Sequence, residues 1–335
     1  MTALSISKSR KIVVSGQNGQ KPLIFIWDAE TAEVIGSKKL PKGSRLVTAI
    51  AISANDKYIV ASDASEKIFC HIFKVDGKST PIADVQIGQK VVHLNFHPTE
   101  DGRFASAGKD HLAICNFDGT KKIDKKNASG KVVSQCSAAW IDDPKYPNDI
   151  ITGGADGTLY HWTGNKAGGK GVSNNKGPVQ CVAARADEKH GQLVLAGGND
   201  KSLTVYKFAG SLTKMWKVTV DAAPRSVDLF QNQLLLGLKN GSIVQMPMTA
   251  DGQNAEQSVI MKSHCDGEVW AMELIDFEDG SMRLITASDD NRLLAYNPME
   301  KKHISEGSVA VIEGATAGGS PKKKGKKRGA SKKKT

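Results

Sequence analysis

The stretch "GGADGTLYHW" (residues 153–162) joins two small residues, an Asp-Gly pair and a run of apolar and aromatic residues. The same order returns in "GGNDKSLTVY" (197–206) and "ASDDNRLLAY" (287–296), and more faintly in "SAGKDHLAIC" (106–115) and "GLKNGSIVQM" (237–246). Asp-Gly and Asn-Gly tolerate the positive φ angles that tight hairpin turns need. Each copy therefore predicts the end of one strand, a tight turn and the start of the next strand.

These copies recur at a nearly fixed spacing along the whole chain. Aligned on the strand that follows the turn, the units end at Trp27, His71, Cys115, Trp162, Tyr206, Met246 and Tyr296, with intervals of 44, 44, 47, 44, 40 and 50 residues. A period of about 40–45 residues with several short strands per unit is typical of a WD-type β-propeller. We therefore predict an all-β fold, a seven-bladed WD40-type β-propeller.

Each unit divides into four expected strands. In the second unit, "VTAIAIS" (47–53) and "YIVAS" (58–62) are the first two, and "TKMWKVTV" (213–220) is typical of the polar fourth strand. "TALSIS" (2–7) supplies the first strand of blade one, and "KHISEGSV" (302–309) the fourth strand of blade seven. No strand is then left to interlock the two blades. We expect face packing alone to close this seam, and the seam to open first.

The residues that give WD repeats their name are only partly kept. Trp27-Asp28 is the one Trp-Asp pair that ends a third strand. In blade seven, His264, Ser288 and Asp290 are spaced for the buried hydrogen-bonded chain that fixes a turn against its sheet. We interpret this trio as structural and not as a catalytic triad.

The net charge of +11 is unevenly distributed. Residues 314–335 carry eight Lys, one Arg and no acidic residue, so the preceding 313 residues hold 37 basic and 35 acidic groups. We predict a propeller over residues 1–312 and a disordered Lys-rich tail over 313–335, because such a segment has almost no apolar surface to bury. The tail cations expected to meet a partner are Lys322, Lys323, Lys324, Lys326, Lys327, Arg328, Lys332, Lys333 and Lys334.

Composition argues against several other classes of protein. No apolar run approaches the roughly 18–20 residues that a membrane span needs, and "MTALSISKSRK" has no apolar core of a signal peptide. The five cysteines are widely spaced without a C-x-x-C pair, which indicates buried thiols and neither a disulfide framework nor a zinc site.

Two stretches resemble catalytic or metal-binding motifs. "GNKAGGKG" (164–171) has the spacing of a phosphate-binding loop, but Gly171 replaces the Ser or Thr that binds magnesium and no helix is expected to follow. His93 and His97 share one face of an expected strand, but no third ligand is close in the sequence. We therefore expect no enzyme activity, no cofactor, no metal site and no small-molecule substrate.

With the units laid out, the chain resembles the first propeller of the echinoderm microtubule-associated protein-like family. The stretches that carry the resemblance are "TALSISKSRKIVVSGQ" (2–17), "VVHLNFHPTEDGRFASAGKDHLAICNFDG" (91–119) and "SHCDGEVWAMELID" (263–276). The match runs in order from residue 2 to about 300. It implies a protein of the cytoplasm and cytoskeleton, on microtubules and in some members the ciliary axoneme, with tubulin or microtubule-associated proteins as partners.

Propellers contact partners through the loops at the rim of the ring, where side chains are free of core packing. The rim cations expected to face an acidic lattice lie in or beside the turn between the second and third strands, or near the loop that leads to the next blade. They are Arg45, Lys109, Lys201, Arg225, Lys239 and Arg292.

The tail leaves two functions open. As an electrostatic tether it would meet acidic tubulin tails; alternatively "KKKGKKR" is an import signal or an RNA clamp, and the chain is a nuclear or nucleolar WD-repeat scaffold. Without aromatic residues for base stacking, nucleic acid would bind only through the charge of the tail. No amphipathic face or lipidation motif points to a membrane.

Overall fold

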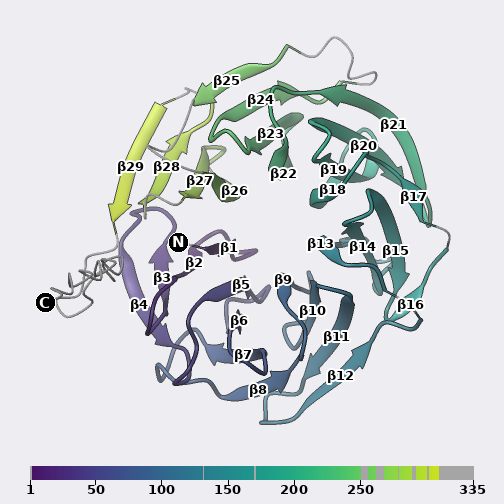
Figure 1. Cartoon of the computed structure of the whole chain (residues 1–335). Coiled ribbons are helices and arrows are strands. Elements are labelled where there is room, and N and C mark those ends of the chain that lie inside the picture. Colours follow the sequence, from purple (N-terminus) through teal and green to yellow (C-terminus); the bar gives the residue numbers. More distant parts are fainter. Residues whose placement is uncertain are drawn as a thin grey trace, which may run out of the picture.

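Seven antiparallel sheets surround a central axis, as Figure 1 shows. The computed structural model describes residues 2–130, 132–169, 171–249, 256–261, 268–277, 279–288, 292–299 and 302–308. Every regular element in these ranges is a strand, and each sheet is formed by consecutive strands of the chain. The predicted seven-bladed propeller is therefore confirmed. No helix in the described ranges has the length and apolar character required to cross a membrane.

The strands follow the sequence blade by blade. Blade one comprises β1 (Ala3–Ile6), β2 (Ile12–Gly16), β3 (Leu23–Asp28) and β4 (Val34–Lys39), and blade two β5 (Val47–Ile52), β6 (Tyr58–Asp63), β7 (Phe69–Lys74) and β8 (Ala83–Gln86). Blade three comprises β9 (Val91–Phe96), β10 (Arg103–Gly108), β11 (His111–Phe117) and β12 (Ile123–Asn127). Blade four comprises β13 (Gln135–Trp140), β14 (Asp149–Gly154), β15 (Thr158–Thr163), β16 (Lys166–Ala167) and β17 (Val172–Ser173). Blade five comprises β18 (Val179–Asp187), β19 (Gly191–Gly198), β20 (Ser202–Phe208) and β21 (Leu212–Thr219). Blade six comprises β22 (Pro224–Phe230), β23 (Gln233–Leu238), β24 (Ile243–Pro247) and β25 (Ser258–Met261). Blade seven comprises β26 (Val269–Asp276), β27 (Met282–Ser288), β28 (Arg292–Asn297) and β29 (Lys302–Ser308).

We letter the strands of each blade a to d in chain order. The a strands line the axis and the d strands form the perimeter (Figure 1). The b and c strands lie between neighbouring blades and are almost wholly buried; every residue of β14 is buried, for example. The d strands have one solvated face, so β12 alternates half-buried and exposed residues along "IDKKN". This gradient explains why the second and third strands are apolar runs in the sequence while the fourth is polar.

The repeated small residue at the end of strand b makes room for the next blade. A Cβ atom placed on Gly16 would lie 2.5 Å from Cβ of Val47, the first residue of β5. Such a separation is far below any van der Waals contact, so a larger residue would force the two blades apart. Two further blades repeat the contact, in the pairs Gly153–Val179 and Gly197–Pro224.

The Asp-Gly and Asn-Gly pairs adopt the turns that they predict. Gly157 has a φ of +84° and Gly241 a φ of +79°, both in the left-handed region. In blades three and five the corresponding turns place Asp110 (φ +52°) and Lys201 (φ +61°) in that region. These two residues adopt a conformation that costs a non-glycine residue roughly 1–2 kcal/mol.

Blade four departs from the expected four strands. Its d strand is divided into β16 and β17, which pair with opposite ends of β15. The Gly/Lys loop of residues 168–171 lies between the two pieces, and Lys170 is outside the described residues. A side chain on Gly168 would lie 2.8 Å from the His161 ring, so this loop crosses the sheet edge at close range.

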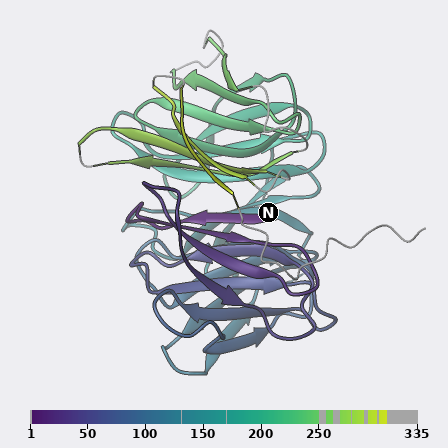
Figure 2. The same cartoon turned by 90° about the vertical axis from the view of Figure 1, so that its left-hand side faces the viewer.

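No strand of the described residues crosses from blade seven into blade one. β1 pairs with β2, and β29 pairs with β28, so each blade is made from one segment of the chain. Figure 2 shows this seam from the side, with the two sheets stacked face against face. Apolar side chains close it, among them Phe25 and Trp27 from blade one and Ile275, Ile285 and Leu293 from blade seven.

Two arginines also cross the seam. From the sequence we expected face packing alone and did not predict them. Arg10 pairs with the Asp276 carboxylate and donates a hydrogen bond of 2.8 Å from Nη1 to the Asp276 carbonyl oxygen. In the other direction, Arg283 Nη1 donates to the carbonyl oxygen of Glu30 at 2.6 Å. The ring is thus closed by side chains where an interlocking strand would otherwise provide backbone hydrogen bonds.

Candidate docking surfaces

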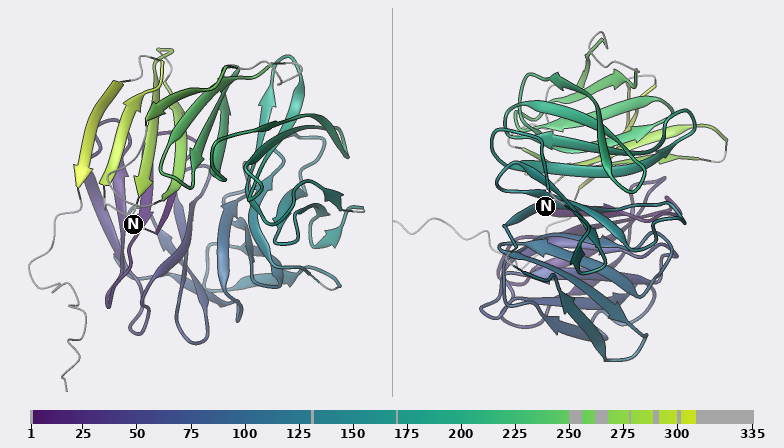
Figure 3. Two further views of the ribbon diagram at one scale, coloured as in Figure 1. Left: turned by 45° about the horizontal axis from the view of Figure 1, so that its top comes forward. Right: turned by 90° about the vertical axis from the view of Figure 1, so that its right-hand side faces the viewer.

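The antiparallel blades give the ring two different faces. Because strands a to d alternate in direction, the b–c turns and d–a loops reach one face, and the a–b and c–d connections reach the other. We call these the turn face and the opposite face. The strands run across the thickness of the ring between them, as Figure 3 shows.

Four of the six predicted rim cations occupy the turn face as expected. Lys109, Lys201 and Lys239 are exposed in the b–c turns of blades three, five and six. Arg45 is exposed in the loop between β4 and β5. These four side chains are exposed to solvent and take no part in core packing.

The other two predicted rim cations, Arg225 and Arg292, are not seen as exposed side chains of the turn face. Arg225 lies on β22, where Nη1 donates to Gln180 Oε1 at 2.7 Å and Nη2 faces Glu268 Oε1 at 3.5 Å. The Arg225 side chain is only 20 % exposed, so it is part of the channel wall and not a free rim cation. Arg292 begins β28, but its side chain lies outside the described residues.

Sequence reasoning missed five more exposed cations of the turn face. They are Lys21, Lys42, Lys67, Lys90 and Lys176. Each lies in a b–c turn or a d–a loop, so the repeat register that located Lys109 could also have located them. None of the nine exposed cations of this face forms an ion pair within the described part of the chain.

Acidic residues are fewer on the turn face and several are held by neighbours. Within the described ranges the exposed ones are Glu66, Asp110, Asp156 and Asp221. Asp110 accepts a hydrogen bond of 2.6 Å from Ser134 Oγ, and Asp156 one of 2.6 Å from Tyr160 Oη. Asp200 is half-buried and pairs with Lys217 Nζ at 2.9 Å. The described part of the turn face therefore carries an excess of free positive charge.

The opposite face has no such excess. Its exposed acidic residues within the described ranges include Glu30, Glu33, Asp76, Glu100, Asp118, Asp142, Glu188 and Asp279. Its exposed lysines are Lys8, Lys11, Lys57, Lys78, Lys121, Lys122, Lys145 and Lys189. Charges of both signs are interspersed, which is the ordinary character of a solvated surface.

A cavity of 760 Å³ opens on the turn face at blade two. It lies between the β4–β5 loop and the β6–β7 turn, with Lys42, Arg45 and Lys67 among its lining residues. His71 and Asp63 lie at its base, and both are almost completely buried.

The alignment of the second unit on His71 is wrong by two residues, because the strand register places Phe73 where blades one and four have Trp27 and Trp162. Both His71 nitrogens face carboxylates, Nδ1 at 2.5 Å from Asp84 Oδ1 and Nε2 at 3.3 Å from Asp63 Oδ2. Burial disfavours the charged imidazolium, but these two acidic partners outweigh it and raise the pKa of His71. The base of the cavity is therefore a buried histidine between two carboxylates, which favour its charged form.

The central channel has a volume of 990 Å³ and is lined by the a strands of all seven blades. Near the opposite face, Arg185 holds Asp228 with two hydrogen bonds, Nε to Oδ1 at 2.7 Å and Nη2 to Oδ2 at 3.0 Å. Burial and the Asp228 carboxylate raise the pKa of Glu273 to about 8. Lys8 reaches from blade one to Asp142 of blade four at 3.1 Å. These contacts join distant blades and leave the charges of the channel largely satisfied.

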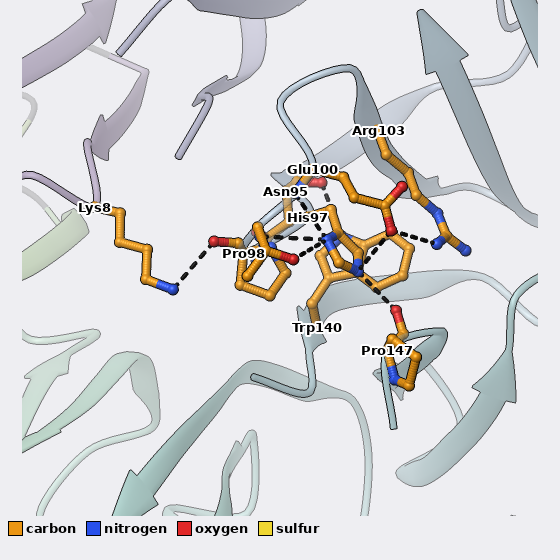
Figure 4. Close-up of polar contacts among 9 residues, drawn as sticks. Lys8, Asn95, His97, Pro98, Glu100, Arg103, Trp140 and Pro147 are labelled. Carbon is orange, nitrogen blue, oxygen red and sulfur yellow. Dashed lines mark hydrogen bonds and ion pairs between the residues drawn. The ribbon is translucent and has the colours of Figure 1, made fainter. Parts of the chain in front are cut away.

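His97 joins blades three and four and is not placed as a metal ligand (Figure 4). β9 ends at Phe96, so His97 lies just beyond the strand on which the sequence placed it. Its Nε2 donates to the Pro147 carbonyl oxygen at 2.7 Å, and its Nδ1 accepts from the Glu100 backbone N–H at 3.1 Å. Both nitrogens are thereby occupied. Burial lowers the pKa of His93 to about 4, and this side chain faces the channel.

The Trp-Asp pair of blade one acts structurally. Trp27 is buried, and Asp28 Oδ1 accepts from the backbone N–H groups of Glu30 and Thr31 at 2.9 and 2.8 Å, which fixes the turn. In blade seven, Ser288 is buried, while His264 and Asp290 lie outside the described residues. The predicted network of these three residues stays a prediction. The same holds for the tail cations Lys322 to Lys334, which are also outside the described residues.

The ring of repeated four-stranded blades defines a WD-repeat β-propeller. A solved structure described as the Myceliophteria thermophila Cps50 (Swd1) beta-propeller domain superposes with a TM-score of 0.69, covering 88% of this chain and 96% of that one at 13% identity. That likeness shows the fold. No protein-family model matches the chain.

Curated sequence relatives point to one family. The "Ciliary WD repeat-containing protein ctxp80" of Euplotoides octocarinatus is 30% identical over 310 residues, which is 90% of this chain and 40% of that protein. The "77 kDa echinoderm microtubule-associated protein" of Strongylocentrotus purpuratus is 25% identical over 61% of this chain and 30% of its own length. The rat "Echinoderm microtubule-associated protein-like 1" is 24% identical over 81% and 34%. The resemblance found in the sequence is confirmed: over most of its length the chain is similar to ciliary and echinoderm microtubule-associated protein-like WD-repeat proteins. It spans 30–40% of the length of these three relatives.

Proposed function

We propose that the chain is a non-catalytic, microtubule-associated WD-repeat propeller. It docks on tubulin or on an axonemal or other cytoskeletal complex, and residues 313–335 tether it electrostatically. The observation that carries this proposal is that relatives named for cilia and microtubules align with the propeller itself, over 90% of the chain in one case. Its site of action would then be the cytoskeleton within the cytoplasm.

The charge of the described residues supports docking through the ring. Arg45, Lys109, Lys201 and Lys239 are exposed and unpaired on the turn face, so a partner would not have to break internal ion pairs to reach them. The tail would add a longer-ranged attraction. This attraction acts over about 8 Å at physiological ionic strength, which makes it sensitive to salt.

Microtubule co-sedimentation at low and at physiological salt tests the proposal. The full chain is compared with a version ending at Glu313, which retains β29, the last described strand. We expect both versions to pellet with microtubules, and the full chain to lose more binding as salt rises.

The other outcomes contradict the proposal in distinct ways. Pelleting by the full chain alone, lost at higher salt, would reduce the association to non-specific charge. If neither version pelleted while the full chain bound RNA or an import receptor, the nuclear scaffold would replace the microtubule assignment.

A further inference from the structure

We infer that one arc of the turn face, over blades one to three, binds an extended acidic polypeptide segment. This arc, which we call the basic arc, consists of Lys21, Lys42, Arg45, Lys67, Lys90 and Lys109, all exposed. The inference rests on the proposed function, since it assigns the docking surface and the chemistry of the partner.

Positive charge is concentrated in the basic arc and not spread over the whole turn face. On the arc and in its cavity, the exposed acidic residues within the described ranges are Glu66, Asp84 and Asp110. Asp84 pairs with His71, and Asp110 is held by Ser134. Over blades four to six the described turn face has fewer exposed cations, Lys176, Lys201 and Lys239. Three acidic residues lie among them, namely Asp156, which Tyr160 holds, Asp200, which pairs with Lys217, and Asp221. An acidic partner would therefore be attracted to blades one to three.

Backbone hydrogen bonds connect the loops of the basic arc into one surface. The Gly19 N–H donates to the Arg45 carbonyl oxygen at 2.9 Å, and the Ala64 N–H to that of Leu46 at 3.1 Å. Further along, the Gly88 N–H donates to the Ile68 carbonyl oxygen at 3.3 Å.

A further backbone hydrogen bond links the loop between blades two and three to the turn of blade three: the Lys109 N–H donates to the Lys90 carbonyl oxygen at 2.9 Å. The six cations are thus carried by loops that support one another. A surface fixed in this way binds with less loss of loop entropy than separate flexible loops would.

The blade-two cavity gives the basic arc an anchoring point. Its mouth is lined by Lys42, Arg45 and Lys67, so a carboxylate side chain entering it would meet three cations. The acidic groups at its base are engaged internally. Asp63 accepts four hydrogen bonds, from Ser44, Ser65, His71 and the Phe69 N–H, and Asp84 pairs with His71. Glu66 is the one acidic lining residue that forms no hydrogen bond or ion pair with another described residue.

The surface favours a polypeptide over a nucleic acid. Non-specific binding of single strands uses aromatic side chains as stacking platforms. Within the described residues, Trp27, Trp140, Trp162 and Trp216 are all buried, and Phe69, inside the cavity, is the one aromatic side chain near the arc. Because the cations follow an arc across three blades, the partner must be extended and must carry acidic groups along its length.

Fluorescence anisotropy with a labelled peptide of alternating glutamate and glycine tests the inference. The arc variant carries Lys42→Glu, Arg45→Glu and Lys67→Glu; the control carries Lys176→Glu, Lys201→Glu and Lys239→Glu. Both keep the tail, and both change net charge equally. We expect the arc variant to bind the peptide about tenfold more weakly than the wild type, and the control to lose less than about twofold. Unchanged circular dichroism and melting temperature confirm that both variants fold.

Equal losses in the two variants would overturn the inference, because net charge alone would then explain binding. Tighter and arc-dependent binding of a single-stranded RNA probe would replace the acidic polypeptide with a nucleic acid. Microtubule co-sedimentation separates this inference from the proposed function. If the arc variant pellets like the wild type, the arc is wrong and microtubule association stands. If the wild type does not pellet but binds the peptide through the arc, the arc stands and microtubule association is wrong.

Discussion

Gly16 and its counterparts show what a single missing side chain does in this ring. Strand b of blade one ends against Val47, the first residue of β5, and at Gly16 only a residue without Cβ leaves the space. The small-residue pair at the start of each sequence copy is therefore a packing requirement between blades, and the Asp-Gly pair after it is a turn requirement within a blade.

Replacing Gly16 with alanine is expected to destabilise the protein by about 1–3 kcal/mol, because the added methyl group overpacks against Val47. Gly36→Ala is the matched control, since it lies on β4 of the same blade and its Cβ would be 3.6 Å from the nearest Ile26 atom. Chemical denaturation of both variants measures the difference. Equal free energies of unfolding would mean that the two blades can separate slightly without cost.

His71 makes stability depend on pH. Its pKa is raised in the folded state, so the stability it contributes is complete below the unfolded pKa of roughly 6.5 and is lost as the pH rises through the folded value. We expect the melting temperature of the wild type to fall over this range more steeply than that of His71→Gln, which cannot titrate. Parallel curves would show that Asp63 and Asp84 do not hold a charged imidazole.

At the scale of the element, the strands could be predicted from the sequence and their exceptions could not. Periodicity located the units, and even β29 was expected within one residue of its observed end. The division of the blade-four d strand, the pairing of Arg225 with Glu268 and the blade-two cavity were not predicted. These features depend on contacts between residues far apart in the chain, and such contacts leave no periodic trace in a single sequence.

The seam between blades one and seven can be tested directly. We expect amide hydrogen exchange to be faster in blades one and seven than in blade four, because side-chain contacts and not shared strands close the ring there. Replacing both Arg10 and Arg283 with alanine removes the two ties and should increase exchange in these blades selectively.

A matched control for the seam is Arg103→Ala, which removes a contact over Trp140 between blades three and four. It should increase exchange at that junction and leave blades one and seven unchanged. If the double variant at the seam exchanged like the wild type, apolar packing alone would hold the ring closed.

At the scale of the whole molecule, the two faces differ in charge although the propeller is nearly neutral. Residues 1–313 carry 37 basic and 35 acidic groups, yet exposed cations outnumber exposed acidic residues on the described part of the turn face and not on the opposite face. A charged surface interacts mainly with the charges on the nearest face of a protein and less with its net charge, because the electrostatic interaction decays over about 10 Å at 0.1 M salt.

We therefore expect the version ending at Glu313 to be retained on a cation-exchange column at neutral pH and low salt. Substituting Lys42, Arg45 and Lys67 with glutamate should lower the salt needed for elution more than the same substitution of Lys57, Lys78 and Lys121 on the opposite face. Identical elution of the two variants would show that net charge, and not its distribution, governs retention.

The contiguity of each blade also bears on how the protein is made. In a ring closed by a shared strand, one strand must wait unpaired, with its edge exposed, until the last blade has been synthesised. Here every described blade pairs strands from its own segment only. Each sheet can therefore form as its segment leaves the ribosome, and ring closure is left as a final docking of two finished surfaces.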